Sequence, residues 1–385
     1  MIEIDRSEMN PDELSEKIAR RVALTMMRGV TASFLREAQS LGLTADDLAD
    51  FDHKRVDRIG GILWSNRECE FGPCLDFGRR EAAFIMRHSI RPLFLTDDDY
   101  PRRLAEIEDA PMMLYVLGDA DLDGRNMAAF VGTRKVTPPG VAQTRRLVKE
   151  CADRYPELTT VSGLAYGVDA AAHEASLEAA CPTVAVLAHG LDMIYPAQHR
   201  NLAKRILEEG GALVSEYVSG TRPYRGRFLE RNRIIAGLSD VVVVTESNVR
   251  GGAMATARYA RSYDREVLAV PGRLSDEMSS GCNLLIKNNV AAILTQASDI
   301  GDAACWPQPA ETAFMTQRSL FPELEGDNLE VYKCMKALGD GEPIAFDVIH
   351  RQSGLSVSQT LGVLSELEFE DIVARHPGNR FSLLR

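Results

Sequence analysis

The sequence lacks any apolar stretch of about 18 residues, the length at which a membrane-spanning helix becomes a candidate, so we expect no membrane span. Its first residues, MIEIDRSEMNPDEL, are acidic and contain no apolar core, so we expect no signal peptide. The seven cysteines are scattered and form no C-x-x-C pair, which argues against a disulfide framework and against a zinc site. We expect reduced, mostly buried thiols, no metal and no cofactor, in a cytoplasmic protein.

An excess of positive charge is also missing. The chain carries 44 Lys and Arg against 56 Asp and Glu, a formal net charge of −12. A protein that binds nucleic acid through overall basicity is therefore excluded, whereas a local basic patch on an acidic molecule is not. The 385 residues are 45% hydrophobic, which is enough for two or three folded domains.

The two common nucleotide-binding motifs are absent from the place where one would look for them. The segment FVGTRKVTPPG, residues 130–140, ends a short apolar run at Gly132 and continues with Thr133 and Arg134. It has neither the later glycines of G-x-G-x-x-G nor a G-K-[ST] triplet. A glycine turn, a hydroxyl and an arginine remain, and the guanidinium fork matches phosphate oxygens. We predict a phosphate-binding turn that is not a dinucleotide site.

Four regions differ in their residue pattern. Residues 1–91 have apolar positions at three- and four-residue spacing, which predicts a small all-helical domain. Residues 92–300 are predicted to form an α/β domain, of which 92–126 are an extended, proline-containing lead-in segment. Residues 301–327 show no period and are predicted to be a linker. Residues 328–385 contain three helical patterns and two short extended pieces, which predict a winged helix.

Strands and helices alternate from about residue 127 to residue 300. The runs MAAFVG, LTTVSG, TVAVLAHG, GALVSEY, DVVVVTES and EVLAVPG are apolar on both sides and are separated by amphipathic segments. This pattern predicts an extended Rossmann-like, doubly wound, mainly parallel sheet with helices on both faces. Ligands of such sheets bind beyond the carboxyl ends of the strands, and here those ends carry Gly, Ser, Thr, His and Arg residues.

One helix-forming segment carries a possible acid–base pair. In VSGLAYGVDAAAHEAS, Asp169 and His173 are one turn apart and share a face. We favour a packing histidine that is hydrogen-bonded to Asp169 over a catalytic pair, because no nucleophile motif such as G-x-S-x-G accompanies it. Glu246, at another strand end, is a further acid–base candidate.

The segment SGTRPYRGRFLERNR, residues 219–233, is the most basic part of the chain, and we call it the arginine–aromatic segment. It holds five arginines and one acidic residue, with Tyr224 and Phe228 between them. Cations interleaved with aromatic rings suit a single nucleic-acid strand, because the charges follow its backbone while the rings stack on its bases. The segment therefore predicts a surface for single-stranded nucleic acid.

Several of these stretches together resemble the DprA/Smf family of DNA-processing proteins. The matching stretches include VGTRKVTPPG, SGLAYGVDAAAHEASLEA, TVAVLAHGLDMIYPAQHRNL, FLERNRIIAGLSDVVVVTES and GGAMATARYA, in the family's order over roughly 200 residues. The resemblance implies an extended Rossmann domain that binds single-stranded DNA. It also implies a homodimer formed through that domain, and a recombination mediator that protects incoming DNA and loads RecA onto it during natural transformation. The family's conserved arginine matches Arg134, and its R-N-R motif matches Arg231, Asn232 and Arg233.

The chain departs from the family at three places. Tyr166 stands where Arg or Lys is usual, Gly251 and Gly252 replace a Ser-Gly pair, and the SAM-like or helix-hairpin-helix-like N-domain keeps only Gly29 of its glycine pair. We therefore expect little DNA binding from the N-domain. The predicted DNA-binding residues are Gly132, Thr133, Arg134, Ser162, Gly163, Tyr166, Arg200, Lys204, Arg225, Arg227, Phe228, Arg231, Asn232, Arg233 and Arg250.

Two other functions remain open at this point. A Rossmann-type nucleotide hydrolase of the phosphoribohydrolase kind would use Asp169, His173 or Glu246, but the chain lacks the P-G-G-x-G-T stretch of such enzymes. A duplex-reading transcription regulator would use the predicted recognition helix SVSQTLGVLSELEFED, which has four acidic residues and no Lys or Arg. Carboxylates repel phosphates in a groove, so a protein contact or simple packing is the favoured role of the winged helix.

Overall fold

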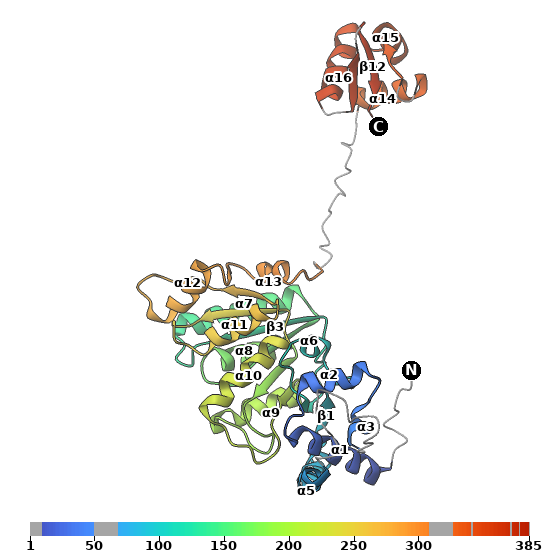
Figure 1. Cartoon of the computed structure of the whole chain (residues 1–385). Coiled ribbons are helices and arrows are strands. Elements are labelled where there is room, and N and C mark those ends of the chain that lie inside the picture. The colour runs from blue at the N-terminus through green and yellow to red at the C-terminus, as the bar shows by residue number, and fades with distance from the viewer. Residues whose placement is uncertain are drawn as a thin grey trace. The chain divides into compact units, whose positions relative to one another are not determined.

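The computed structural model describes residues 10–49, 68–307, 326–339, 342–369, 372–376 and 378–384. The chain divides into two compact units, Met1–Pro309 and Ala310–Arg385 (Figure 1). Most of the predicted linker lies outside the described residues. Within the described ranges, none of the helices combines the length and the apolar character that crossing a bilayer requires.

A nine-stranded sheet organises the first unit, in the order β1-β2-β6-β5-β4-β3-β7-β8-β9. The strands are β1 Arg91–Phe94, β2 Met113–Gly118, β3 Asn126–Gly132, β4 Leu158–Ser162, β5 Thr183–Leu187, β6 Ala212–Ser215, β7 Val241–Glu246, β8 Glu266–Ala269 and β9 Ala292–Ile293. Strands β3 to β9 pair in parallel. The predicted α/β fold with a mainly parallel sheet is confirmed.

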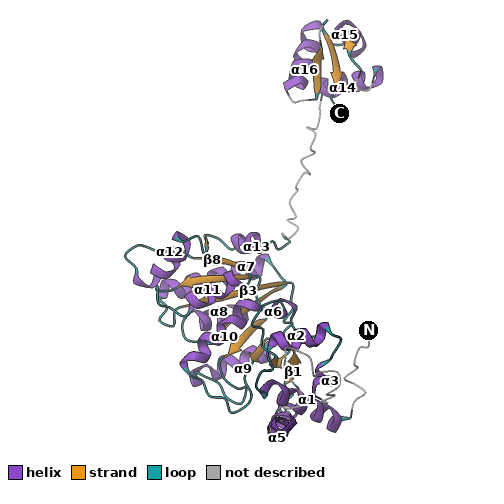
Figure 2. Cartoon of the chain, viewed as in Figure 1, coloured by secondary structure: helices purple, strands orange, loops and turns teal. Residues whose placement is uncertain are grey.

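Helices flank the strands on both faces of this sheet (Figure 2). They are α6 Arg102–Ala105, α7 Pro138–Arg154, α8 Val168–Glu178, α9 Arg200–Glu208, α10 Arg225–Gly237, α11 Ala253–Ser262, α12 Ser280–Lys287 and α13 Ser298–Ala303, with short 3-10 turns η3 Ala197–His199 and η4 Glu277–Ser279. Successive side chains of β3 point to opposite faces, so Ala129 and Val131 join one core while Ala128 and Phe130 join another. This double burial explains why β3 is apolar at every position from Met127 to Val131.

The lead-in segment over 92–126 is more than a connector. It supplies β1 and β2, which pair antiparallel with each other and through β2 with β6. Tyr100, in the connection between these two strands, is buried and donates a hydrogen bond to the carbonyl of Pro111 (2.7 Å). The segment thereby closes one edge of the parallel sheet with two antiparallel strands.

The N-terminal helices are α1 Pro11–Met26, α2 Ala32–Ser40, α3 Ala45–Ala49 and α5 Glu68–Arg87. Helices α1 and α5 cross closely, since a Cβ on Gly78 would lie 2.1 Å from the carbonyl oxygen of Ala19. Arg21 ties these helices to the α/β domain, because its guanidinium donates to Asp46 (2.9 Å) and to Asp97 (2.6 Å). The helical domain is thus anchored by ion pairs as well as by its apolar core.

The second unit is a winged helix, as predicted. It contains α14 Gly326–Leu338, β10 Ile344–Ala345, α15 Phe346–Ser353, α16 Val357–Phe369, β11 Val373–His376 and β12 Arg380–Leu383, with the sheet order β10-β12-β11. Helix α16 buries Val363, Leu364 and Leu367 in the small core of this unit, which residues of its other helices and strands share.

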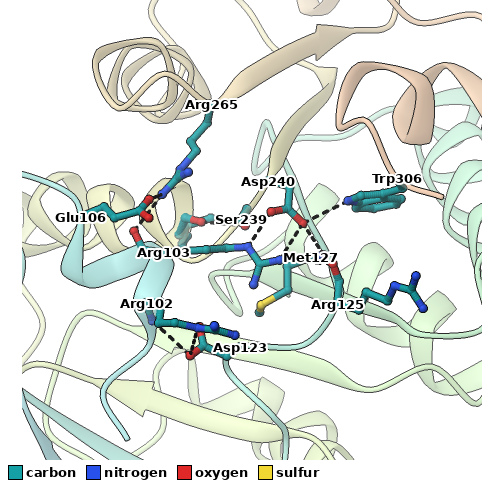
Figure 3. A network of polar contacts seen from close by, with 11 residues as sticks. Arg102, Arg103, Glu106, Asp123, Arg125, Met127, Ser239, Asp240, Arg265 and Trp306 are labelled. Atoms are coloured by element: carbon teal, nitrogen blue, oxygen red, sulfur yellow. Dashed lines mark hydrogen bonds and ion pairs between the residues drawn. The ribbon is translucent and has the colours of Figure 1, made fainter. Parts of the chain in front are cut away.

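A polar network closes the amino-terminal edge of the large sheet (Figure 3). The carboxylate of Asp240, just before β7, accepts hydrogen bonds from Arg103 (2.5 Å), from the backbone N–H of Met127 (2.9 Å) and from the Trp306 indole (3.1 Å). These contacts join α6, the start of β3 and the segment after α13. The carboxyl edge, where ligands of such sheets bind, lies at the other end of the same strands.

Candidate nucleic-acid interface

The candidate site lies where the strand order reverses, between β3 and β7. The chain leaves these two neighbouring strands toward opposite sides, and ligands of open α/β sheets bind at such a switch point. The backbone N–H of Thr133 donates to the carbonyl oxygen of Glu246 (2.7 Å). The Glu246 carboxylate in turn accepts from the N–H (3.2 Å) and the hydroxyl (2.9 Å) of Thr137, the N-cap of α7. The turn after β3 is therefore held in one shape by backbone and carboxylate contacts.

Glycines allow three elements to meet at this turn. A Cβ on Gly132 would lie 2.4 Å from the Val168 side chain, and a Cβ on Gly167 would lie 2.1 Å from the carbonyl oxygen of Thr133. Gly167 also has a φ of +82°, which side-chain-bearing residues rarely adopt. As a result, the start of α8 touches the turn, and the N–H of Val168 donates to the Thr133 carbonyl (3.2 Å). Gly132 and Thr133 shape the site.

Arg134 is exposed at the tip of this turn and lies on an aromatic ring. Its guanidinium carbon is 4.7 Å from the centroid of Phe228, and the Phe228 ring is 5.8 Å from that of Tyr195. We call these three residues the Arg134 cluster. Its members come from the end of β3, from α10 and from the loop after β5, and Tyr195 is 43% exposed. A cation and two rings at one surface can hold a phosphate and stack bases.

Tyr195 was not among the residues that the sequence predicted. It stands in LDMIYPAQHR, outside the arginine–aromatic segment, and a lone aromatic in a loop gives a weak signal. Only the folded chain brings it beside Phe228.

A second exposed ring lies in the loop between β4 and α8. Tyr166 is 42% exposed, its hydroxyl donates to the Gln198 carboxamide (2.7 Å), and its ring contacts the His199 ring edge-on at 4.9 Å. His199 is itself held by the Leu164 carbonyl (2.8 Å). These contacts orient the Tyr166 ring, so it is available for stacking where the family has a cation.

Arg231 is placed in the interior. Only 2% of its surface is exposed, and its Nη1 donates to the carbonyls of Gly163 (2.7 Å) and Val186, beyond the end of β4 and within β5. Burial lowers the pKa of Arg231 to about 10, and the nearby carboxylate of Asp169 opposes that shift. A Cβ on Gly163 would lie 2.1 Å from this guanidinium. The geometry gives Arg231 and Gly163 a supporting role beneath the surface.

Three more predicted residues lie inward. The Ser162 hydroxyl is buried and donates to the Phe130 carbonyl (2.7 Å), and the Asn232 amide donates to the Gly252 carbonyl (3.4 Å). Arg233 is paired with Glu216 and its side chain is 14% exposed. Their direct contact with DNA has no support from this arrangement.

The remaining predicted cations face solvent. Arg200, Arg225 and Arg250 are exposed, and Lys204 pairs on the helix surface with Glu208 (3.3 Å). Arg227 lies over the rings of Tyr224 (4.7 Å) and Tyr217 (5.4 Å). Arg227 is thus held by aromatic faces, in the same way as Arg134.

The acid–base candidates are engaged in contacts that hold the fold. His173 is fully buried; its Nε2 accepts from the N–H of Leu164 (3.3 Å) and its Nδ1 is 2.7 Å from the Thr183 hydroxyl. Burial lowers its pKa to about 3. The packing role expected of His173 fits this geometry, but the expected partner Asp169 was wrong. Burial raises the pKa of Asp169, while Glu246 caps the turn described above.

In the part of the chain that the structure describes, no group of three or more His, Cys, Asp or Glu residues could hold a metal ion. Cys151, Cys181 and Cys282 are buried, and Cys305 is exposed, as unpaired thiols.

Comparison with known proteins shows which family the chain resembles. The family model of DNA recombination-mediator protein A matches residues 91–304, and that of the DprA winged helix domain matches residues 322–379. Protein Smf of Synechocystis sp. is 34% identical over 331 residues, which are 77% of this chain and 82% of that protein.

Two solved structures are also similar. DNA processing protein A from Streptococcus pneumoniae has a TM-score of 0.57 and 29% identity, over 76% of this chain and 96% of that one. DNA processing protein A from Helicobacter pylori has a TM-score of 0.50 and 32% identity, over 55% of this chain and 94% of that one, and its structure concerns a unique single-stranded DNA binding mode.

Proposed function

We propose that this chain, which belongs to the DprA/Smf family of DNA-processing proteins, binds single-stranded DNA at the carboxyl edge of its large sheet. The observation that carries the proposal is the Arg134 cluster, an exposed guanidinium laid over Phe228 with Tyr195 beside it. Arg134 contacts a phosphate, and the rings of Phe228, Tyr195 and Tyr166 stack on bases. The Helicobacter pylori relative, whose structure concerns single-stranded DNA binding, supports this assignment.

The other predicted residues divide between contact and support. Arg200, Lys204, Arg225, Arg227 and Arg250 add positive charge along the path of the strand. Gly132, Thr133, Ser162, Gly163, Arg231, Asn232 and Arg233 hold the turn and α10 in place. Contacts of the first kind depend on salt, because each neutralised phosphate releases counterions.

The test is fluorescence anisotropy with a labelled oligo-dT strand and a matching duplex at several salt concentrations. We expect salt-sensitive binding that favours the single strand. Arg134→Ala should weaken binding and reduce the slope of log affinity against log salt by about one. Arg125→Ala is the matched control, because Arg125 pairs with Glu157 (3.0 Å) just before β3, at the opposite edge of the sheet. Equal loss in both variants, or none in Arg134→Ala, would contradict the assignment.

We further propose that the protein acts in the cytoplasm as a homodimeric recombination mediator that protects incoming DNA and loads RecA onto it. Family membership supports this role. Light scattering of the full chain measures the oligomeric state. A strand-exchange assay on strands coated with single-strand-binding protein measures loading, and the Arg134→Ala variant should fail in it.

A role for the winged helix in reading duplex DNA is not part of this proposal. Helix α16 carries Glu366 and Glu368 and no Lys or Arg, so contact with a protein is its proposed use. Tight binding of the full chain to the duplex arm of the anisotropy test would overturn this view.

A further inference from the structure

We propose that the N-terminal helical domain sets the DNA affinity of the α/β domain through Glu81, a positioning residue that anchors the start of the arginine–aromatic segment. The inference rests on the proposed function, because its consequence is read out as DNA affinity. It assigns to the helical domain a task that does not require the domain to touch DNA.

The carboxylate of Glu81 is buried at the boundary between the two domains. Glu81 lies on α5 and is 3% exposed. Its Oε1 accepts from the backbone N–H of Ser219 (2.9 Å) and its Oε2 accepts from the Ser219 hydroxyl (2.5 Å). Both carboxylate oxygens therefore engage one residue, the first of the arginine–aromatic segment, 138 positions along the chain. Hydrogen bonds are stronger where water is excluded.

The loop that Glu81 holds is pinned from its other side by the α/β domain itself. The N–H of Gly220 donates to the Asp192 carboxylate (3.0 Å), and the N–H of Gly190 donates to the carbonyl of Thr221 (3.0 Å). Ser219 is thus fixed between α5 and the loop after β5. The loop after β5 is also the one that carries Tyr195 of the Arg134 cluster.

Tyr217, two residues before Ser219 in the chain, begins a series of contacts that includes residues proposed to meet DNA. Tyr217 donates its hydroxyl hydrogen to Glu230 on α10 (2.9 Å), and its ring supports the Arg227 guanidinium at 5.4 Å. Arg227 in turn donates to the carbonyl of Arg222 (2.5 Å). One turn of α10 further along from Tyr224 stands Phe228, under Arg134.

This arrangement preorders the segment before DNA arrives. A loop held in its bound shape saves the entropy that ordering it would cost on binding. Without the Glu81 anchor, the loop must be ordered when DNA binds, so the entropic cost falls on the binding step. No cation is removed. The affinity should fall while the number of released counterions, and hence the salt slope, stays the same.

The helical domain offers a matched control. Arg36 on α2 donates to the carbonyls of Ala105 (2.8 Å), Ile107 (2.6 Å) and Glu108 (3.0 Å). It joins the same domain to the α/β domain through the end of α6 and the segment after it, which are not part of the arginine–aromatic segment. Arg36→Met loosens that junction without touching Ser219.

The experiment compares the full-length wild type with Glu81→Leu, Glu81→Gln and Arg36→Met. Oligo-dT anisotropy across a salt series is measured together with hydrogen–deuterium exchange of the peptides covering residues 216–224. A glutamine can accept from the Ser219 N–H and donate to its hydroxyl, so Glu81→Gln separates lost hydrogen bonds from lost charge. We expect about tenfold weaker binding for Glu81→Leu, equivalent to about 1.4 kcal/mol, with an unchanged salt slope and faster exchange over 216–224. Glu81→Gln and Arg36→Met should stay within about twofold of the wild type.

Other outcomes overturn the inference. Wild-type affinity or wild-type exchange in Glu81→Leu would show that Glu81 does not hold the segment. Equal losses in Glu81→Leu and Arg36→Met would show a general effect of domain loosening. A wild type that fails to bind DNA would refute the proposed function, and unchanged exchange in Glu81→Leu would then refute the anchor separately.

Discussion

Replacing Arg231 separates a buried support from a DNA contact. The R-N-R motif, read as sequence, predicts that Arg231 grips a phosphate. The structure buries it and directs its Nη1 to the carbonyls of Gly163 and Val186. We expect Arg231→Leu to lower the stability of the fold and to leave the number of phosphate contacts unchanged.

The magnitude follows from what the substitution leaves behind. Asp169 is 7% exposed; burial raises its pKa, and the positive charge of Arg231 opposes that shift. The substitution removes this electrostatic interaction between two buried groups, which adds to its cost. Two buried carbonyls also lose a hydrogen-bond donor, at about 1–3 kcal/mol each, so the expected loss is about 2–6 kcal/mol. Arg231→Lys keeps the charge but not the fork, so we expect roughly half of the loss.

Urea unfolding measures the free energy of unfolding of each variant. The salt series of the anisotropy assay measures the number of phosphate contacts that the folded variant makes. We expect the free energy of unfolding of Arg231→Leu to be about 2–6 kcal/mol lower than that of the wild type, with an equal salt slope. Arg134→Ala should show the reverse, wild-type stability and a slope reduced by about one. An Arg231→Leu variant with wild-type stability and a reduced slope would refute the reasoning.

Three further predictions concern stacking, pH and the far edge of the sheet. Tyr195→Ala should weaken oligo-dT binding by about 1–3 kcal/mol without changing the salt slope, since it removes a ring and no charge; a changed slope in the anisotropy series would contradict this. Burial lowers the pKa of His173 to about 3, so the unfolded chain binds more protons below pH 6.5. Stability held above that pH is therefore lost as the pH falls, by about 2 kcal/mol from pH 7 to pH 5. Urea unfolding of His173→Gln should not show this loss of stability between pH 7 and pH 5. A pH profile identical to that of the wild type would disprove the prediction. Asp240→Ala should cost about 3 kcal/mol of stability through the loss of its Arg103 pair, with normal DNA binding in the folded protein; weaker binding would tie the two edges together.

The pattern of apolar runs predicted the parallel strands of the sheet, whereas it did not predict that β1 and β2 join the same sheet. Central strands such as β3 and β7 carry apolar residues toward both faces because both faces are covered, and such runs stand out in a sequence. The lead-in segment contains Pro92, Pro101 and Pro111, which are typical of loops and sheet edges. Its pairing partner β6 follows about 100 residues later, and local pattern carries no information about that contact.

The position of the site could be predicted from the sequence, but not which of its residues are exposed and which are buried beneath them. Gly132, Thr133 and Arg134 follow a strand, so their place at the carboxyl edge follows from topology. The prediction that Arg231 contacts DNA failed to anticipate its burial, because arginine is rarely buried. Its buried neighbour Asp169 is 62 positions away, so the local sequence gave no sign of this environment. The contribution of Glu81 had no local signal, since one acidic residue on an amphipathic helix is common.

The cation–π contact between Arg134 and Phe228 has a consequence for the rate of DNA binding. Because the cation already rests on its ring in the unbound chain, the encounter with a DNA strand needs no slow rearrangement of the turn. Association should then be a single fast phase whose rate falls as salt screens the attraction. The chain carries a net charge of −12 and repels DNA overall, so the exposed cations at the carboxyl edge also decide from which side a strand arrives.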